Sequence, residues 1–439
     1  MKTVAGPPSL AGPGSESYSA RQLHAILGFA LLGTLFDGAE LNLVGYPLTY
    51  IASTLHVSTL ALVSVTTLQG IASIAGGLLF GWLGDTLGRR RTYAACVLAF
   101  GVAAALGGLA PNYPTFLLTR LLAGVGMGGL FGLSFSLFAE AWTTTRRGAM
   151  GGMIQAMYYV GEILTEGVLF VCLVRFGHLL GWRAGYLVLG IGSIVVGLAA
   201  LWLLPESLKW LDYQRQLRAG TLQADRRRTR VPLIDALRPE FAFGTAVFVV
   251  LATAMFLTTN SLTAYLSTYL LKDQHLPLGT ASLIVLFGYL CTMTSFAAAG
   301  ALSDAIRRKY AYLCGCVFGL VGFGWFAVQV VAHLDHVGTA YWASPTFWAL
   351  MMCAGAAGGF GVLGVWMSEF FPTRIRSSGS NGSYYVGRGL GAGVFPLFAL
   401  TIAGTVPMAL ALGIVGPAAG ILFSAIAPDR TGRTITSLD

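Results

Sequence analysis

The chain is built from apolar blocks that are each long enough to cross a lipid bilayer as one helix. Such a helix needs about 20 mostly apolar residues. Twelve segments meet this requirement, and they begin near residues 23, 58, 92, 114, 149, 184, 242, 278, 309, 345, 379 and 406. Only 10% of the residues are charged, against about 25% in a soluble domain. The sequence therefore predicts an all-α membrane protein with twelve transmembrane helices.

One long polar connection, residues 205–240, divides the twelve segments into two sets of six. We therefore expect an N-terminal six-helix bundle over residues 21–204 and a C-terminal six-helix bundle over residues 241–428, joined by a cytoplasmic linker. Residues 1–20 are rich in Gly, Pro, Ser and Ala, which predicts a disordered cytoplasmic tail. Residues 429–439 are expected to form a second cytoplasmic tail.

The basic residues predict how the helices are oriented. With the N-terminus in the cytoplasm, all but five of the 27 Lys and Arg residues lie on the cytoplasmic side. The exceptions are Arg175, Arg183 and Lys272 in outer loops, and Arg120 and Arg388 inside helices. This bias follows the positive-inside rule, so the net charge of +9 reflects topology and not nucleic-acid binding. We expect a monomeric multi-pass protein of the inner membrane with both termini cytoplasmic.

Neither catalysis nor a bound cofactor is expected. The 6 cysteines lie in apolar segments without metal-ligand spacing, and the 6 histidines form no cluster. The chain has no Gly-x-x-x-x-Gly-Lys phosphate-binding loop. We therefore predict no enzyme, no metal site and no ATP-driven pump.

The two halves carry the same charged motifs in the same order. In each half, an Asp and a basic run follow the second helix, and a Glu precedes an Arg by seven residues after the fourth. The set comprises Asp85, Arg89, Arg90, Glu140 and Arg147 in the first half, and Asp304, Arg308, Glu369 and Arg376 in the second. Parallel repeats imply a pseudo-two-fold axis along the membrane normal. We expect these residues to act as a gate that holds the cytoplasmic side closed; the alternative is ordinary topology-setting charge with surface ion pairs.

On these motifs the chain resembles the major facilitator superfamily over nearly its whole length. Pro205–Leu211 and Gly181–Arg183 are similar to motifs of its sugar-porter-like branch. Thr143 departs from the pattern, because the first Glu-x-x-Pro motif carries proline there; Pro372 keeps it in the second half. The resemblance implies two six-helix bundles and transport by alternating access.

Acidic residues inside apolar helices are the candidates for proton coupling. Ionisable groups are costly in the bilayer and mark functional sites. Asp37 and Glu40 share one face of the first helix, and two close carboxylates in a low dielectric do not readily ionise together. The stretch resembles the Asp-Gly-x-Asp element of aromatic acid:proton symporters, with Glu40 in place of the second Asp. Arg120 is expected to neutralise Asp37 or Glu40, and Glu162 is a second proton candidate; purely structural pairs are the alternative.

Arg388 is the main candidate for substrate binding. A guanidinium offers two parallel donors to a carboxylate, and nearby tyrosines can stack on a ring. The run from Gly387 to Pro396 resembles the eleventh helix of aromatic acid symporters and organic anion transporters. The alternative is that Glu162 neutralises Arg388. The other candidates for substrate contact are Asn381, Tyr384, Tyr385, Tyr158, Gln155, Asn42, Tyr46, Asn260, Tyr265 and Trp366.

These features predict a proton-coupled secondary transporter that imports a small organic anion, in particular an aromatic or heterocyclic carboxylate. Three alternatives stay open. The sugar-porter-like motif after the sixth helix favours a sugar or polyol symporter. The acids on the first and fifth helices would suit an exporter of drugs or organic cations. A non-transporting sensor on the same fold is the third.

Overall fold

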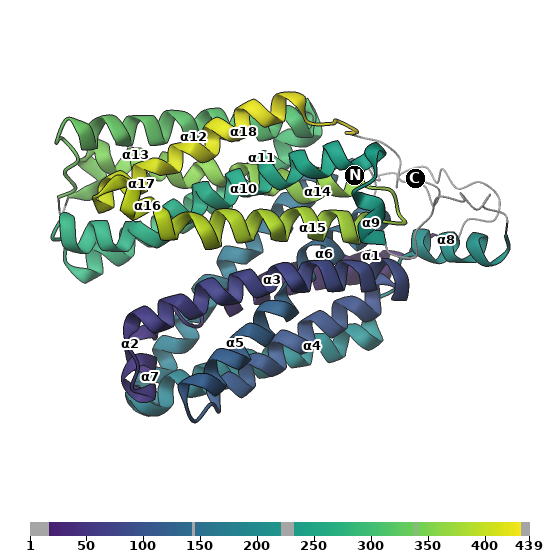
Figure 1. Cartoon of the computed structure of the whole chain (residues 1–439), viewed down its shortest axis with the longest axis horizontal. Helices are drawn as coiled ribbons and strands as arrows, with labels where there is room; N and C mark the ends of the chain where they lie inside the picture. The colour runs from purple at the N-terminus through teal and green to yellow at the C-terminus, as the bar shows by residue number, and fades with distance from the viewer. Residues whose placement is uncertain (1–16, 143–144, 221–231, 339, 432–439) are drawn as a thin grey trace, which may run out of the picture.

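The computed structural model describes residues 17–142, 145–220, 232–338 and 340–431, and all regular secondary structure in them is helical (Figure 1). The N-terminal half contains α1 (Ala20–Asn42), α2 (Leu48–Leu55), α3 (Thr59–Leu87), α4 (Arg89–Gly108), α5 (Tyr113–Met127), α6 (Leu130–Ala141) and α7 (Arg147–Leu203). The predicted tails fall largely on residues 1–16 and 432–439, which lie outside the described residues. The predicted linker contains α8 (Leu208–Arg218) and α9 (Pro232–Ala236).

The C-terminal half repeats this arrangement. It contains α10 (Pro239–Thr268), η1 (Tyr269–Asp273), α11 (Leu278–Ile306), α12 (Arg308–Val331), η2 (Tyr341–Ala343), α13 (Pro345–Gly355), η3 (Ala356–Gly359), α14 (Phe360–Phe370), α15 (Arg376–Arg388), η4 (Gly389–Val394), α16 (Phe395–Ala403), α17 (Val406–Ala411), η5 (Leu412–Ile414) and α18 (Val415–Ile426). The two halves form two bundles side by side (Figure 1). They meet where α3 packs on α15 and α7 packs on α11.

The prediction of twelve transmembrane helices is confirmed within the described residues. Ten stretches there are long and apolar enough to cross a membrane. One of them, α7, is two helices joined at Gly177, whose φ of 71° and ψ of 179° interrupt the helix. The stretch from α15 through η4 to α16 adds the remaining helix; its polar first half keeps it below the hydropathy of the others.

Short local signals set where the helices begin. The side chains of Ser58 and Asn112 accept hydrogen bonds from the first-turn N–H groups of α3 and α5, as N-capping residues do. The turn from α3 to α4 is a single residue, Gly88, with φ 105° and ψ 157°. The corresponding turn from α11 to α12 is Arg307, with φ 77° and ψ 156°. The repeated motif therefore has the same backbone shape in both halves.

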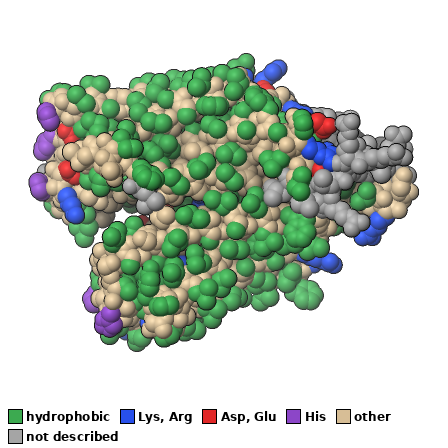
Figure 2. Space-filling view, viewed as in Figure 1, with side chains coloured by type: hydrophobic (Ala, Val, Ile, Leu, Met, Phe, Trp, Pro, Cys, Tyr) green, Lys and Arg blue, Asp and Glu red, His purple; other side chains and the backbone are tan. Residues whose placement is uncertain are grey.

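The surface of the molecule is divided in the way a bilayer requires. Hydrophobic side chains cover the flanks of both bundles, whereas Lys and Arg gather mainly at the end near α8 and α9, and His at the opposite end (Figure 2). Exposed apolar residues on these flanks include Val174, Leu198, Val328 and Leu422. This distribution identifies a multi-pass membrane protein.

Candidate functional site

A cavity of about 250 Å³ lies between the two halves. Its walls come from α1, α3 and α7 on one side and from α10, α11, α14 and α15 on the other. A hollow between the bundles opens at the end opposite α8 (Figure 2). The predicted residues that line the cavity are Asn42, Gln155, Tyr158, Glu162, Asn260, Tyr384 and Arg388. In the described part of the chain, no group of three or more His, Cys, Asp or Glu side chains could hold a metal ion.

Arg388 is buried and lines this cavity from the end of α15. Its Nη1 lies 3.9 Å from Oδ1 of Asp37 on α1, in the other half of the molecule. That separation is too long for a hydrogen bond, and Asp37 Oδ1 has no hydrogen-bond partner among the described residues. The guanidinium also lies over the rings of Phe256 and Tyr385, at 6.0 and 5.7 Å. Asp37 therefore balances the charge of Arg388 without hydrogen bonding to it.

Glu40 has a different partner from Asp37. Its Oε1 lies 2.6 Å from Nη1 of Arg120, whose Nη2 donates to the carbonyl of Ala103 at 3.1 Å. The Arg120 guanidinium is also 4.9 Å from the ring centre of Tyr186. Both charged side chains are buried inside the N-terminal bundle, and neither lines the cavity. Two acids, Asp37 and Glu40, were predicted as partners for Arg120, and the structure pairs it with Glu40. Glu162 was the alternative partner for Arg388, but the acid within 4 Å of Arg388 is Asp37.

Glu162 and Gln155 share one stripe of α7 that faces the cavity. Glu162 Oε2 and Gln155 Oε1 are buried acceptors with no hydrogen-bond partner among the described residues. This stripe of α7 packs closely on α1 because each helix has a glycine at the contact, Gly38 on α1 and Gly161 on α7. A Cβ at Gly38 would lie 2.0 Å from the carbonyl oxygen of Tyr158, and one at Gly161 would lie 1.8 Å from that of Leu35. Only glycine permits this contact, which brings Asp37 beside the α7 stripe.

Two predicted substrate contacts on α15 instead join the halves. Asn381 donates to the carbonyl of Gly129 at 3.0 Å and accepts from the N–H of Gly132 at 2.6 Å. The hydroxyl of Tyr385 donates to the carbonyl of Met127 at 2.6 Å. Both side chains are fully buried against the N-terminal bundle. The prediction that they line the substrate cavity is therefore not supported by the geometry.

Three further predicted contacts lie away from the cavity. Tyr46 is an exposed residue of the turn after α1, at 42%. Tyr265 is buried in the core of the C-terminal bundle. Trp366 is fully buried in α14, and its Nε1 donates to the carbonyl of Pro428 at 2.9 Å. The structure does not bring these three side chains to the cavity wall, and their contact with a substrate stays a prediction.

Sequence reasoning missed the wall that α10 and α11 contribute. Phe256, Thr259 and Thr263 on α10, and Tyr289 on α11, all line the cavity. Nothing in an apolar helix distinguishes such residues from core packing. Only the predicted Asn260, which is polar and mid-helix, pointed to this face.

The gating residues meet at the end near α8, in two matching sets. In the first, the Asp85 carboxylate accepts the N–H groups of Ser377 and Ser378 at 3.1 and 2.8 Å, at the start of α15. In the second, Asp304 accepts those of Gly148 and Ala149 at 2.8 and 2.9 Å, at the start of α7. Each carboxylate therefore binds the positive end of a helix in the other half.

The glutamates of the repeat add crossed ion pairs. Glu140 lies 2.5 Å from Nη1 of Arg376 in the other half and 3.3 Å from Nη2 of Arg89. Glu369 mirrors it, with Arg147 of the other half and Arg308 each at 3.0 Å. All these side chains are buried. The two sets join the halves at the end opposite the hollow between the bundles (Figure 2).

Linker residues reinforce this closure. The hydroxyl of Ser207 donates to Glu140, and Nε1 of Trp210 donates to the carbonyl of Asp85 at 2.9 Å. The Glu206 carboxylate accepts the backbone N–H groups of Arg89 and Arg90 at 2.9 and 3.2 Å. Burial raises the pKa of Glu206, against the lowering effect of these donors. Arg90 thus takes part through its backbone. The Pro-Glu-Ser motif, noted above only for its resemblance to sugar-porter-like proteins, was the signal that could have indicated these linker contacts.

The comparisons with known proteins agree with this architecture. Residues 30–396 match the family model described as Major Facilitator Superfamily. The cis,cis-muconate transport protein of Acinetobacter baylyi is 28% identical over 389 residues, which cover 84% of each chain. The sialic acid transporter NanX of Escherichia coli is 24% identical over 389 residues, covering 88% of this chain and 89% of that protein. The proton:xylose symporter XylE of E. coli, solved with 6-bromo-6-deoxy-D-glucose, matches with a TM-score of 0.76 at 18% identity, over 95% of this chain and 98% of that chain.

Proposed function

Because the chain belongs to the major facilitator superfamily, we propose that it is a secondary transporter that imports a small organic anion together with protons. The observation that carries the anion is Arg388, a buried guanidinium at the cavity between the halves. A buried charge needs a compensating partner. Asp37 supplies the charge from 3.9 Å but no hydrogen bond, so a carboxylate in the cavity would find the guanidinium donors within reach.

Proton coupling follows because Asp37 and the substrate carboxylate would share one arginine, Arg388. A carboxylate bound to Arg388 would place a second negative charge beside Asp37, and like charges at short range repel strongly where water is scarce. A proton on Asp37 removes that repulsion and leaves Arg388 to the substrate. Anion and proton would therefore favour each other's binding, which is the reciprocity expected of coupled sites. Glu162, whose Oε2 faces the cavity unpaired, is the second proton candidate.

The relatives support an acidic substrate of moderate size. Cis,cis-muconate and sialic acid, which two of the relatives are named for, are carboxylic acids. An aromatic or heterocyclic carboxylate fits the tyrosines around Arg388. The alternatives are a sugar or polyol symporter, favoured by the Pro205–Leu211 motif, and an exporter of organic cations, favoured by Glu162. Arg388 weighs against both, because neither a sugar nor a cation supplies negative charge.

The gate gives the proposed transport cycle its two states. The crossed carboxylates join the ends of α3, α7, α11 and α15, and the hollow between the bundles lies at the opposite end (Figure 2). Rocking of the halves would break these contacts and expose the cavity to the cytoplasm. The proposed setting is the inner membrane, with a monomer whose termini and gate are cytoplasmic.

Ligand binding to purified protein tests the substrate class. Thermal unfolding of the detergent-solubilised protein should shift upward with carboxylates and not with sugars, polyols or organic cations at equal concentration, because a ligand stabilises the state that binds it. A shift with sugars and none with carboxylates would replace this proposal by the sugar symporter.

A further inference from the structure

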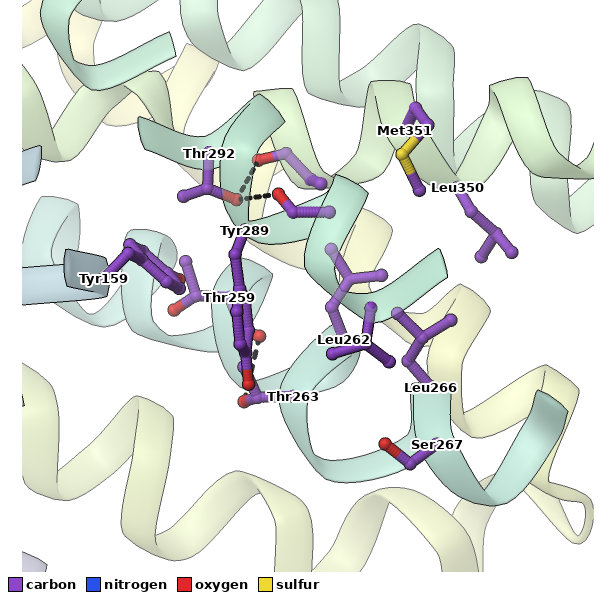
Figure 3. A pocket seen from close by; sticks show the side chains of 13 residues that line it. Tyr159, Thr259, Leu262, Thr263, Leu266, Ser267, Tyr289, Thr292, Leu350 and Met351 are labelled. Carbon is purple, nitrogen blue, oxygen red and sulfur yellow. Dashed lines mark hydrogen bonds between the residues drawn. The ribbon is translucent and has the colours of Figure 1, made fainter. Parts of the chain in front are cut away.

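A second, smaller cavity lies mainly within the C-terminal bundle, and Tyr159 of α7 also lines it (Figure 3). It lies between α10, α11 and α13, and its volume is about 50 Å³. A water molecule needs about 10–15 Å³ on this measure. The side cavity therefore has room for roughly three to five chemical groups the size of a water molecule.

Apolar side chains form much of the wall of the side cavity. Figure 3 shows Tyr289 facing Leu262, Leu266, Leu350 and Met351 across it. A hydrated group would find little to bind on such surfaces, whereas an alkyl group or ring edge would be favourably buried.

The threonines at this cavity have their hydroxyl donors engaged within the protein. Thr259 donates to the carbonyl of Met255 at 3.1 Å, and Thr263 donates to that of Thr259 at 3.2 Å. Thr292 donates to the carbonyls of Gly288 and Ala354, at 3.0 and 3.1 Å (Figure 3). Three of the polar side chains that line the cavity therefore do not offer a donor to a ligand.

The side cavity adjoins the central cavity that contains Arg388. Four residues line both cavities: Tyr159, Thr259, Thr263 and Tyr289. Arg388 lies 6.0 Å from the ring centre of Phe256 on α10. Thr259 and Thr263 follow Phe256 by three and seven residues, which is about 4.5 and 10 Å along a helix axis. The side cavity therefore begins about one to two turns of α10 beyond the ring that Arg388 contacts.

We propose that the side cavity is the subsite for an apolar arm of the transported anion. The substrate would be an amphipathic carboxylate, with its carboxylate on Arg388 and a compact alkyl or ring-edge group between α10, α11 and α13. This inference rests on the proposed function and narrows its substrate class. It predicts that affinity rises with apolar length until the side cavity is filled.

Gly288 on α11 lines the subsite and has room for an added Cβ. A Cβ at Gly288 would meet only the Cβ of Ala354, at an ordinary contact distance of 3.9 Å. Gly288→Leu should therefore place its side chain in the cavity. Gly324→Leu is a matched control, because a Cβ at Gly324 on α12 meets only Cδ1 of Ile414, also at 3.9 Å, and Gly324 does not line the cavity.

The test is calorimetric binding of straight-chain carboxylates, from acetate to octanoate, to the detergent-purified full chain. Each methylene that enters the side cavity should raise affinity about fourfold. Gly288→Leu should abolish this rise for the longer acids while acetate binding stays within about twofold, and Gly324→Leu should behave as the wild type.

The outcomes separate the two proposals. If neither these acids nor aromatic carboxylates bind the wild type, the proposed function fails. If carboxylates bind but the length dependence is the same in wild type and Gly288→Leu, the subsite is refuted and the anion site stands. If 1-alkanols of matched length displace the acids as well as the acids displace one another, the cavity binds any alkyl chain, such as a lipid's. Binding would then not require the carboxylate, and the subsite is likewise refuted.

Discussion

Asp37 on α1 and Arg388 on α15 face each other across the boundary between the two halves, 3.9 Å apart and both buried. Glu40, one turn further along α1, is held by Arg120 within its own half at 2.6 Å. Two acids that look equivalent in sequence therefore have different tasks. Asp37 belongs to a loose pair that joins the two halves, and Glu40 belongs to a close pair inside its own bundle.

Removal of the guanidinium should abolish anion recognition. Arg388→Ala should weaken carboxylate binding by about 10- to 100-fold, the range for a lost charge-assisted hydrogen bond. The variant also leaves Asp37 buried without its counter-charge, so its stability is a concern. The Arg388→Gln and Asp37→Asn double variant removes both charges and should stay folded but bind no carboxylate in calorimetry. Wild-type affinity in the double variant would refute the role of Arg388.

Neutralisation of Asp37 alone should separate binding from coupling. Asp37→Asn keeps the shape of the side chain and frees Arg388, so the anion should bind at least as tightly as to the wild type. Uptake into proteoliposomes should lose its dependence on an imposed proton gradient. Substrate-dependent acidification of the lumen at the wild-type level in this variant would place the proton site elsewhere, with Glu162 next to be tested.

Glu40 should matter for stability first. Glu40→Gln leaves the Arg120 charge buried without its partner, which costs about 3–5 kcal/mol in comparable cases. We expect a large fall in the unfolding temperature. Glu40→Gln with Arg120→Met, which removes both charges, should recover much of it. If Glu40→Gln unfolds at the wild-type temperature, the pair is not structural, and its place in proton coupling must be measured directly.

The crossed carboxylates should hold the cytoplasmic side closed. Glu140→Gln with Glu369→Gln removes the charges that bind Arg376 and Arg147 across the halves. Spin labels at the exposed positions Arg91 and Tyr310, in a chain without its native cysteines, should then show a new population at longer distance. An unchanged distance distribution would mean that the gate does not depend on these ion pairs.

Arg307 is strained where its counterpart is glycine. Its φ of 77° and ψ of 156° belong to a region that costs other residues about 1–3 kcal/mol. Arg307→Gly should therefore raise the free energy of unfolding by about 1 kcal/mol, after allowance for the greater chain entropy of glycine. Gly88→Ala should do the opposite, because its Cβ would lie 2.4 Å from Oε2 of Glu206. Thermal unfolding in detergent measures both, and equal stability of Arg307→Gly and wild type would contradict the strain.

The sequence predicted what bilayer thickness and sidedness dictate. Apolar length predicted the helices. The repeated acidic and basic residues predicted the ion pairs between the halves, because the partners lie at the same end of neighbouring helices. The sequence predicted less well which side chains line the cavity, because a small rotation about a helix axis decides which neighbours a side chain meets. Tyr384 lines the cavity, whereas Tyr385, one residue and about 100° further round, bonds Met127 of the other half. Trp366 lies on a helix buried on every side, so no pattern of polarity indicated which face meets the cavity.

The most direct test of the account is uptake of labelled carboxylates, sugars and organic cations into proteoliposomes under an imposed proton gradient. The account predicts gradient-driven accumulation of carboxylates that Arg388→Gln with Asp37→Asn abolishes, and no accumulation of sugars or cations. Accumulation of sugars without carboxylates, or carboxylate uptake that ignores the gradient in the wild type, would contradict it.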